Sequence, residues 1–463
     1  MESSSPPPSY FSTKVIFILF GVASLLGWNA LLTELGFFNH FIPRMKPYTS
    51  FSFLNYFLNI VFQFLIFCKR DLFSLKFQLI GGIIGSIVFL ILIPLTTILL
   101  GKDEMRNVII TGGLVVLMGF INALCCAGFF GLAGNFPLEM IVALSSGQGF
   151  SGIAMNIIQY ICVFSISSED DKGFIIQGII FFIVSILILV VCLLLLLINF
   201  NKEYFQYYLR KSKMKLDSKS ESEKKIKYQS ESEKKMQSEN QIKIDYDNQN
   251  KNDSEKEIKI ESENQIKKQS ENQIKNQTEE KKEKKILNFW ELFIRVWDLD
   301  LIVLYVYVVT FALFPNASIN QKLFGLSPSL ASNTIILIYN VFDTSGRYLV
   351  AALKQSKKLN MIIAFVRSIL LFTLVFNYYC QDGLEWNVNV TSVLLIVNII
   401  LLASTNGIGV TMCFGLAPIQ VEDEYKGQAG TSISFFLIMG IFLGSCIAFG
   451  TTAIIDTFRK PIT

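Results

Sequence analysis

An almost unbroken apolar segment at residues 175–200 is the feature that most limits what this chain can fold into. Ile, Leu, Val and Phe dominate the segment, and it carries no charged side chain. About 20 consecutive apolar residues are enough for a helix to cross roughly 30 Å of bilayer hydrocarbon. A soluble domain cannot cover so much apolar surface in one helix, so the segment predicts a transmembrane helix.

Similar segments recur along the whole chain. Hydrophobic residues make up 52% of it and Phe alone accounts for 41 of its 463 residues, which is typical of a polytopic membrane protein. Hydrophobic segments of bilayer-spanning length predict eleven transmembrane helices. Their expected ranges are 14–38, 48–68, 76–100, 108–132, 138–165, 174–200, 297–315, 330–353, 359–380, 390–417 and 430–455. We therefore expect an all-α polytopic membrane protein.

A hydrophilic segment at residues 201–286 separates six of these helices from the other five. It contains 22 Lys or Arg and 18 Asp or Glu, and it repeats the sequences SESEKK and SENQIK. The segment has too few apolar side chains for their burial to offset the entropy lost when the chain becomes ordered. We therefore expect a disordered, low-complexity linker. The expected parts are a tail (1–13), a six-helix bundle (14–200), the linker, a five-helix bundle (287–455) and a second tail (456–463).

Basic residues beside the spans favour an orientation with the N-terminus in the cytosol. The short loops alone are nearly balanced, and the Lys-rich ends of the linker decide the orientation. The linker is then cytosolic, and an odd number of spans leaves the C-terminal tail outside.

Asp343 and Arg347 lie four residues apart inside the otherwise apolar helix expected at residues 330–353. Four residues is about one helical turn, so the carboxylate and the guanidinium share a face and can pair. An ionised side chain at membrane depth is costly unless it is paired or faces an aqueous cavity, which makes it a candidate functional residue. Two interpretations stay open: a structural ion pair between helices, and a polar contact for a solute.

Short motifs of polar and small residues interrupt five further spans. They read G-W-N at residues 27–29, F-G-L-A-G at 130–134 followed by Pro137 and S-S-G-Q-G at 145–149, S-T-N-G at 404–407 with C-F-G at 413–415, and A-G, F-F and two glycines between 429 and 444. Small residues at helical spacing let helices approach closely, which alone explains most of these glycines.

Together with F-D-T-S-G-R at residues 342–347, these motifs resemble the equilibrative nucleoside transporter family, solute carrier family 29. The resemblance covers all eleven spans. It implies a 6+5 arrangement of helices in two bundles, like the major facilitator fold, with a large cytosolic loop after the sixth span. It also implies facilitative transport of nucleosides by alternating access around a central cavity. Transport of free nucleobases stays open.

The resemblance further implies residues that contact the substrate. Trp28 would pack against the nucleoside with Leu25 and Leu32 around it, and Asp343 and Arg347 would bind its polar groups. Ribose hydroxyls can donate to a carboxylate, and a guanidinium supplies several donors. Four further polar candidates lie on the same or neighbouring spans: Asn29, Gln148, Asn340 and Asn406. For Gln148 and Asn406 the alternative of an amide that only bridges helices stays open.

Two positions depart from the family pattern. Gly27 stands where many members have Pro, which predicts a more flexible first span. Cys126 stands four residues before F-G-L-A-G, where members with affinity for purines often carry Gln. A thiol cannot make the paired contacts of an amide. Either Asn122, one turn earlier on the same face, substitutes for it, or the base selectivity differs.

Other classes of function find little support in the sequence. The chain has one His and its eight Cys show no metal-ligand spacing, so we expect no metal and no cofactor. The absence of a nucleophile motif argues against an enzyme, and the mixed-sign linker argues against a nucleic acid partner. We expect a monomer in the lipid bilayer, at the plasma membrane or in an organelle membrane. Proton-coupled transport stays the alternative, with Glu34 as the candidate extra carboxylate.

Overall fold

The computed structural model describes most of the two expected bundles. The described residues are 11–68, 72–102, 104–133, 136–166, 171–209, 289–319, 321–350, 353, 355–382, 384, 386–422 and 425–458. Apart from residues 201–209, the expected linker lies outside them, as do most of the two expected tails.

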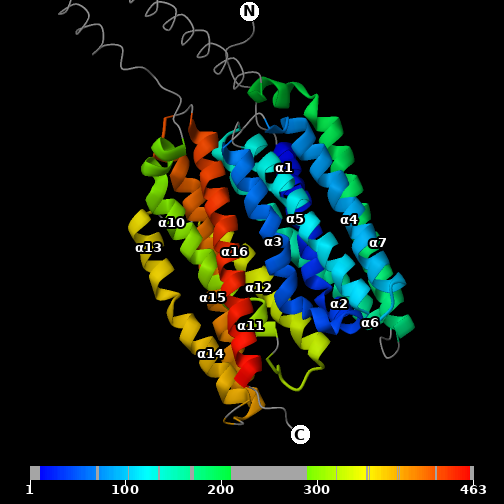
Figure 1. The fold of residues 1–463 in the computed structure, drawn as a ribbon. Helices are drawn as coiled ribbons and strands as arrows, with labels where there is room; N and C mark the ends of the chain where they lie inside the picture. The colour runs from blue at the N-terminus through cyan, green and yellow to red at the C-terminus, as the bar shows by residue number, and fades with distance from the viewer. Residues whose placement is uncertain are drawn as a thin grey trace, which may run out of the picture. The chain divides into compact units, whose positions relative to one another are not determined.

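Helices α1 to α7 lie in the described residues before position 201 (Figure 1). They are α1 (Phe11–Thr33), α2 (Leu35–Phe41), α3 (Pro47–Cys68), α4 (Gly82–Leu99), α5 (Met105–Ala133), α6 (Leu138–Ser165) and α7 (Asp171–Phe200). A 3-10 turn at Pro43–Met45 precedes α3, and a π-helical turn at Phe77–Gly81 leads into α4. The expected first span is broken at Glu34, where α1 ends and the short α2 begins.

Seven helices follow the linker. They are α10 (Phe289–Leu313), α11 (Asn316–Ile319), α12 (Pro328–Leu349), α13 (Lys357–Val366), α14 (Ile369–Asp382), α15 (Val388–Leu416) and α16 (Lys426–Phe458), with a 3-10 turn at Ala417–Ile419 after α15. The expected ninth span is not continuous: α13 and α14 meet at Arg367 and Ser368, where the backbone makes i→i+3 hydrogen bonds. The helix expected at 330–353 ends earlier, at Leu349.

Ten helical segments in the described part of the chain are long and apolar enough to cross a membrane, with α13 and α14 counted as one. The chain is therefore a multi-pass membrane protein, and the prediction of an all-α fold is confirmed. Helix α12 is not among the ten because Asn, Asp, Ser, Thr and Arg side chains lower its hydropathy. It packs against α6 and α15, so these polar side chains meet protein on two sides. The count of eleven spans stays a prediction.

Close approaches at glycine position the helices that carry the polar residues. A Cβ atom at Gly147 of α6 would lie 2.0 Å from the carbonyl oxygen of Ile18 in α1. A Cβ atom at Gly407 of α15 would lie equally close, at 2.0 Å, to the carbonyl oxygen of Asp343 in α12. Any larger residue would force these backbones apart. Tight glycine contacts thus hold α6 against α1, and α12 against α15.

Residues 203–209 are helical and dock on the N-terminal bundle. Phe205 is buried, with its ring 5.7 Å from that of Phe17 and 5.2 Å from that of Phe136. This part of the fold therefore extends past the expected boundary at 200, as far as Tyr208.

Candidate functional site

Asp343 and Arg347 form a buried ion pair on α12, and each is 6% exposed. Arg347 donates from Nε to Asp343 Oδ2 at 2.9 Å. Its Nη1 donates to the hydroxyl of Ser145 at 2.8 Å and to the carbonyl oxygen of Ser145 at 3.2 Å. Ser145 lies on α6, so one guanidinium joins the C-terminal helices to the N-terminal ones.

The other carboxylate oxygen of Asp343 is held from α15. Asn406 donates from Nδ2 to Asp343 Oδ1 at 2.7 Å, and its own Oδ1 accepts from Thr310 of α10 at 2.8 Å. A carboxylate needs donors, so the amide nitrogen of Asn406 must face Asp343 and the amide oxygen must face Thr310. The structure thus brings together three of the expected site residues, Asp343, Arg347 and Asn406.

A second buried arginine continues this network. Arg367 donates from Nη2 to the hydroxyl of Thr310 at 2.6 Å, while its Nε and Nη1 have no hydrogen-bond partner. Sequence analysis missed Arg367, although it lies within the expected ninth span. The signal that singled out Arg347, an ionised side chain inside an apolar helix, applies equally to Arg367.

Aromatic side chains lie beside the ion pair. Trp28 is buried in α1 and packs edge-to-face on Tyr56 of α3, with 5.3 Å between ring centroids. Tyr56 packs in the same way on Phe311 of α10, at 5.9 Å. Tyr307, also on α10, stacks on Phe311 with 6.1 Å between ring centroids. An aromatic group thus joins α1, α3 and α10, and its member Phe311 follows Thr310, which contacts Asn406 beside Asp343.

Asn29 and Gln148 lie in a separate polar cluster between α1 and α6. Asn29 Nδ2 donates to the hydroxyl of Ser151 at 2.5 Å, and Gln148 Nε2 donates to that of Ser24 at 3.2 Å. Both amides bridge the two helices in this structure.

The five remaining expected residues are spread over three helices. Leu25 is half-buried and Leu32 is buried in α1. Asn340 of α12 lies directly against the backbone of Gly152 in α6. A Cβ atom added to Gly152 would lie 2.6 Å from Cγ of Asn340. Asn122 donates to Asn55 Oδ1 of α3 at 2.9 Å, and the Sγ atom of Cys126 lies 3.3 Å from the hydroxyl of Ser434 in α16.

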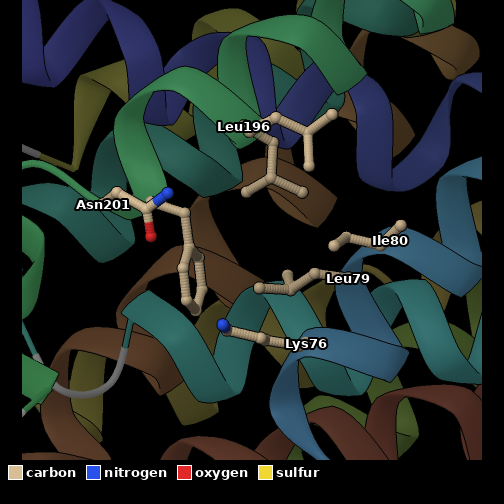
Figure 2. A pocket seen from close by; sticks show the side chains of 7 residues that line it. Lys76, Leu79, Ile80, Leu196 and Asn201 are labelled. Atoms are coloured by element: carbon tan, nitrogen blue, oxygen red, sulfur yellow. The ribbon is translucent and has the colours of Figure 1, made fainter.

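A cavity of about 90 Å³ lies elsewhere, where the π-helical turn before α4 approaches the end of α7 (Figure 2). Its lining is mostly aliphatic, with Lys76 and Asn201 as the polar side chains. None of the expected site residues lines it, so it is distinct from the charged site.

Comparisons with known proteins identify the family. A family model described as "Nucleoside transporter" matches residues 113–453, and equilibrative nucleoside transporter 1 of Rattus norvegicus is 24% identical over 98% of this chain and 99% of its own length. The chain belongs to the equilibrative nucleoside transporter family. Another relative, equilibrative nucleotide transporter 1 of Arabidopsis thaliana, is 22% identical over 96% of this chain and 87% of its own.

A solved structure supports the fold expected for this transporter family member. The major facilitator superfamily proton:xylose symporter XylE, bound to 6-bromo-6-deoxy-D-glucose, superimposes with a TM-score of 0.54. The match covers 97% of this chain and 96% of that one at 13% sequence identity. At this identity the likeness concerns the fold alone, and it agrees with the predicted major-facilitator-like architecture.

Proposed function

We propose that this chain carries nucleosides across a membrane by facilitated diffusion. Family membership supports the substrate class, and the observation that carries the mechanism is the buried Asp343–Arg347 pair tied to Ser145 of the other bundle. Alternating-access carriers bind their solute between the two bundles, so a buried pair that reaches from one bundle to the other supports this assignment.

The chemistry of the pair suits a ribose. Its hydroxyls would donate to Asp343, and its oxygens would accept from the guanidinium of Arg347, in place of the hydrogen bonds with Asn406 and Ser145. Trp28 and Tyr56 would provide an apolar surface for the base. Releasing Ser145 from Arg347 would loosen the contact between α6 and α12, so binding of the solute would favour movement of the bundles.

The other expected residues take weaker parts in this proposal. Leu25 and Leu32 would line the space around Trp28, and Asn340 would act from the same face of α12 as Asp343. Asn29 and Gln148 would mainly hold α1 against α6, because their hydrogen bonds already join those helices. We also propose that the N-terminus is cytosolic, that the carrier works as a monomer in the plasma membrane, and that free nucleobases are carried more weakly because they lack the ribose.

Uptake of radiolabelled nucleosides into oocytes that express the chain tests this function. The expected result is saturable uptake that speeds up when the cells are preloaded with unlabelled nucleoside, as carriers do and channels do not. Water-injected oocytes give the background. Uptake no faster than this background, with the protein present at the cell surface, would contradict the proposal.

Proton coupling is a second candidate because of Glu34. This residue is 2% exposed at the junction of α1 and α2, and its Oε1 has no hydrogen-bond partner. Measuring uptake across imposed pH gradients separates the candidates. Facilitative transport predicts no accumulation above the external concentration, whereas proton coupling predicts accumulation under an inward proton gradient that Glu34→Gln abolishes.

A further inference from the structure

Helix α3 carries a row of three buried amides, Asn55, Asn59 and Gln63, which we call the amide stripe. They are 0%, 2% and 1% exposed. Their spacing of four residues places them on one face of the helix. Three amides on one face of a membrane-spanning helix are costly unless their polar atoms find partners.

Each amide of the stripe has one polar atom without a partner. Asn55 accepts from Asn122, and Gln63 donates to Ser434 at 3.1 Å. Asn55 Nδ2, Asn59 Oδ1 and Gln63 Oε1 have no hydrogen-bond partner. An unpaired buried polar atom costs about 1–3 kcal/mol, so such an atom calls for an explanation. A role in bridging helices does not explain these three atoms, since they bridge nothing.

The Gln63 end of the stripe lies at a contact between the N-terminal and C-terminal helices. Ser434 of α16, in the C-terminal bundle, contacts both Gln63 of α3 and Cys126 of α5 in the N-terminal bundle. A contact between bundles must open during alternating access. The unpaired oxygen of Gln63 is therefore placed to meet a solute when this contact opens, and Asn59 lies one turn away on the same helix face.

The stripe is also connected to the charged site. Tyr56, three residues before Asn59 on α3, packs against Trp28 and Phe311. Phe311 stacks on Tyr307 with 6.1 Å between ring centroids, and it follows Thr310, which contacts Asn406 beside Asp343. A nucleoside with its ribose at Arg347 and its base against Trp28 and Tyr56 would direct the polar edge of the base toward α3.

We propose that Asn59 and Gln63, with Cys126 and Ser434 beside them, bind the hydrogen-bonding edge of the nucleobase and so determine base selectivity. This inference rests on the proposed function. An amide offers both a donor and an acceptor, the combination with which Asn and Gln recognise adjacent donor and acceptor groups on a base. Asn55 pairs with Asn122 and supports the stripe from its other end.

Base selectivity of Asn59→Leu and Gln63→Met tests the proposal. Cytidine and uridine share a ribose but exchange a donor for an acceptor on the base edge, so the ratio of their KM values isolates the base contact. Each substitution is expected to change this ratio by about 3- to 10-fold, the value of one net hydrogen bond. A purely structural role would lower abundance or slow both substrates alike, and would leave the ratio unchanged.

Matched controls come from α7, away from the contact between bundles. Asn199 and Gln177 are also buried amides with one unpaired atom, so Asn199→Leu and Gln177→Met impose the same chemical change. They should leave the ratio at the wild-type value. If a stripe variant fails to reach the membrane, Asn59→Ser replaces the amide by a hydroxyl with less change in volume than Leu, and Gln63→Asn moves the amide back by one methylene while keeping the side chain polar. The same ratio is measured in both.

Three results would overturn the inference. If stripe variants of normal abundance keep the wild-type ratio of cytidine to uridine KM values, the inference on base selectivity is wrong and the proposed function still stands. An equal change in the α7 controls would remove its specificity. No nucleoside uptake by the wild-type protein would overturn the inference together with the proposed function.

Discussion

Arg347 of α12 donates two hydrogen bonds to Ser145 of α6, one to the hydroxyl at 2.8 Å and one to the carbonyl oxygen at 3.2 Å. A solute that binds the guanidinium must compete with both. Only the hydroxyl contact can be removed by substitution, so it can be tested without disturbing the backbone.

Ser145→Ala should lower the KM for nucleosides. The substitution removes one acceptor that competes with the solute for Arg347, and we expect a decrease of about 3- to 10-fold. Ser146→Ala is the matched control, because Ser146 is equally buried and its hydroxyl has no partner. Concentration-dependent uptake measures both variants. A KM that stays the same or rises in Ser145→Ala would show that Ser145 does not compete with the solute.

The relay from Arg367 through Thr310 should orient Asn406 toward Asp343. Thr310→Val removes the hydroxyl that links Arg367 to Asn406, so the amide of Asn406 is free to turn and KM should rise about 3- to 10-fold. Arg367→Lys keeps a donor for Thr310 and should have a smaller effect. Thr373 makes a similar hydrogen bond, 2.5 Å, to Asn398, and Thr373→Val should leave KM unchanged.

A double substitution separates this relay from a purely structural role. If Arg367 acts through Thr310, Arg367→Met combined with Thr310→Val should raise KM no more than the larger single effect. Additive increases in KM would mean that the two residues act independently, and the relay would then be wrong.

The sequence predicted the ion pair of the candidate site but not the contacts around it. Asp343 and Arg347 stand out because charges are rare within apolar helices, and their spacing of four residues fixes their pairing. Ser145 could not be predicted as the partner of Arg347, because contacts between α6 and α12 depend on how two helices far apart in sequence pack. The spacing of Asn55, Asn59 and Gln63 was visible in the sequence. Their unpaired atoms were not, since these depend on the neighbours in α5 and α16.

Helix boundaries also divide into those that the sequence predicts and those that it does not. Apolar segments predict helices well, and α6 spans residues 138–165 as expected. The breaks at Glu34 and Arg367 lie inside apolar segments, so hydropathy gives no signal for them. Hydropathy also ranks α12 as the least membrane-like of the long helices, although it carries the ion pair.

Cys126→Gln should raise the affinity for purine nucleosides relative to pyrimidine nucleosides. The thiol of Cys126 lies at the contact between bundles, and a Gln there adds a donor and an acceptor directed toward the base. Competition of unlabelled adenosine, guanosine, cytidine and uridine against one labelled substrate measures the change. The control is Cys125→Ser, which should leave selectivity unchanged. Serine is used there instead of Gln because Cys125 is fully buried. Unaltered competition in Cys126→Gln, at normal abundance, would show that position 126 does not face the base.

Residues 210–288 should be dispensable for transport. This prediction rests on their repetitive, polar sequence, and a short flexible peptide should replace them without loss of uptake per molecule at the surface. A longer deletion that starts at residue 203 also removes the buried Phe205, whose loss costs about 3–5 kcal/mol, and should lower abundance. Loss of uptake by the shorter deletion at normal abundance would mean that the linker takes part in transport.

Asp343→Asn and Arg347→Lys should each reduce uptake by roughly 10- to 100-fold at normal abundance, because each weakens a charge-assisted hydrogen bond. Asn keeps the shape of Asp without its charge, whereas Lys keeps the charge of Arg without its planar fork. Asp298→Asn is the control. It breaks an exposed ion pair with Lys357 and should have little effect on uptake.

The most direct test of the account is nucleoside uptake by the double variant Asp343→Leu, Arg347→Leu, normalised to protein at the membrane. Replacing a buried ion pair by apolar residues often leaves a protein folded, so a purely structural pair could be lost without harm. If the pair binds the solute, the double variant reaches the membrane and carries no nucleoside above background. Uptake at the wild-type rate would contradict the account.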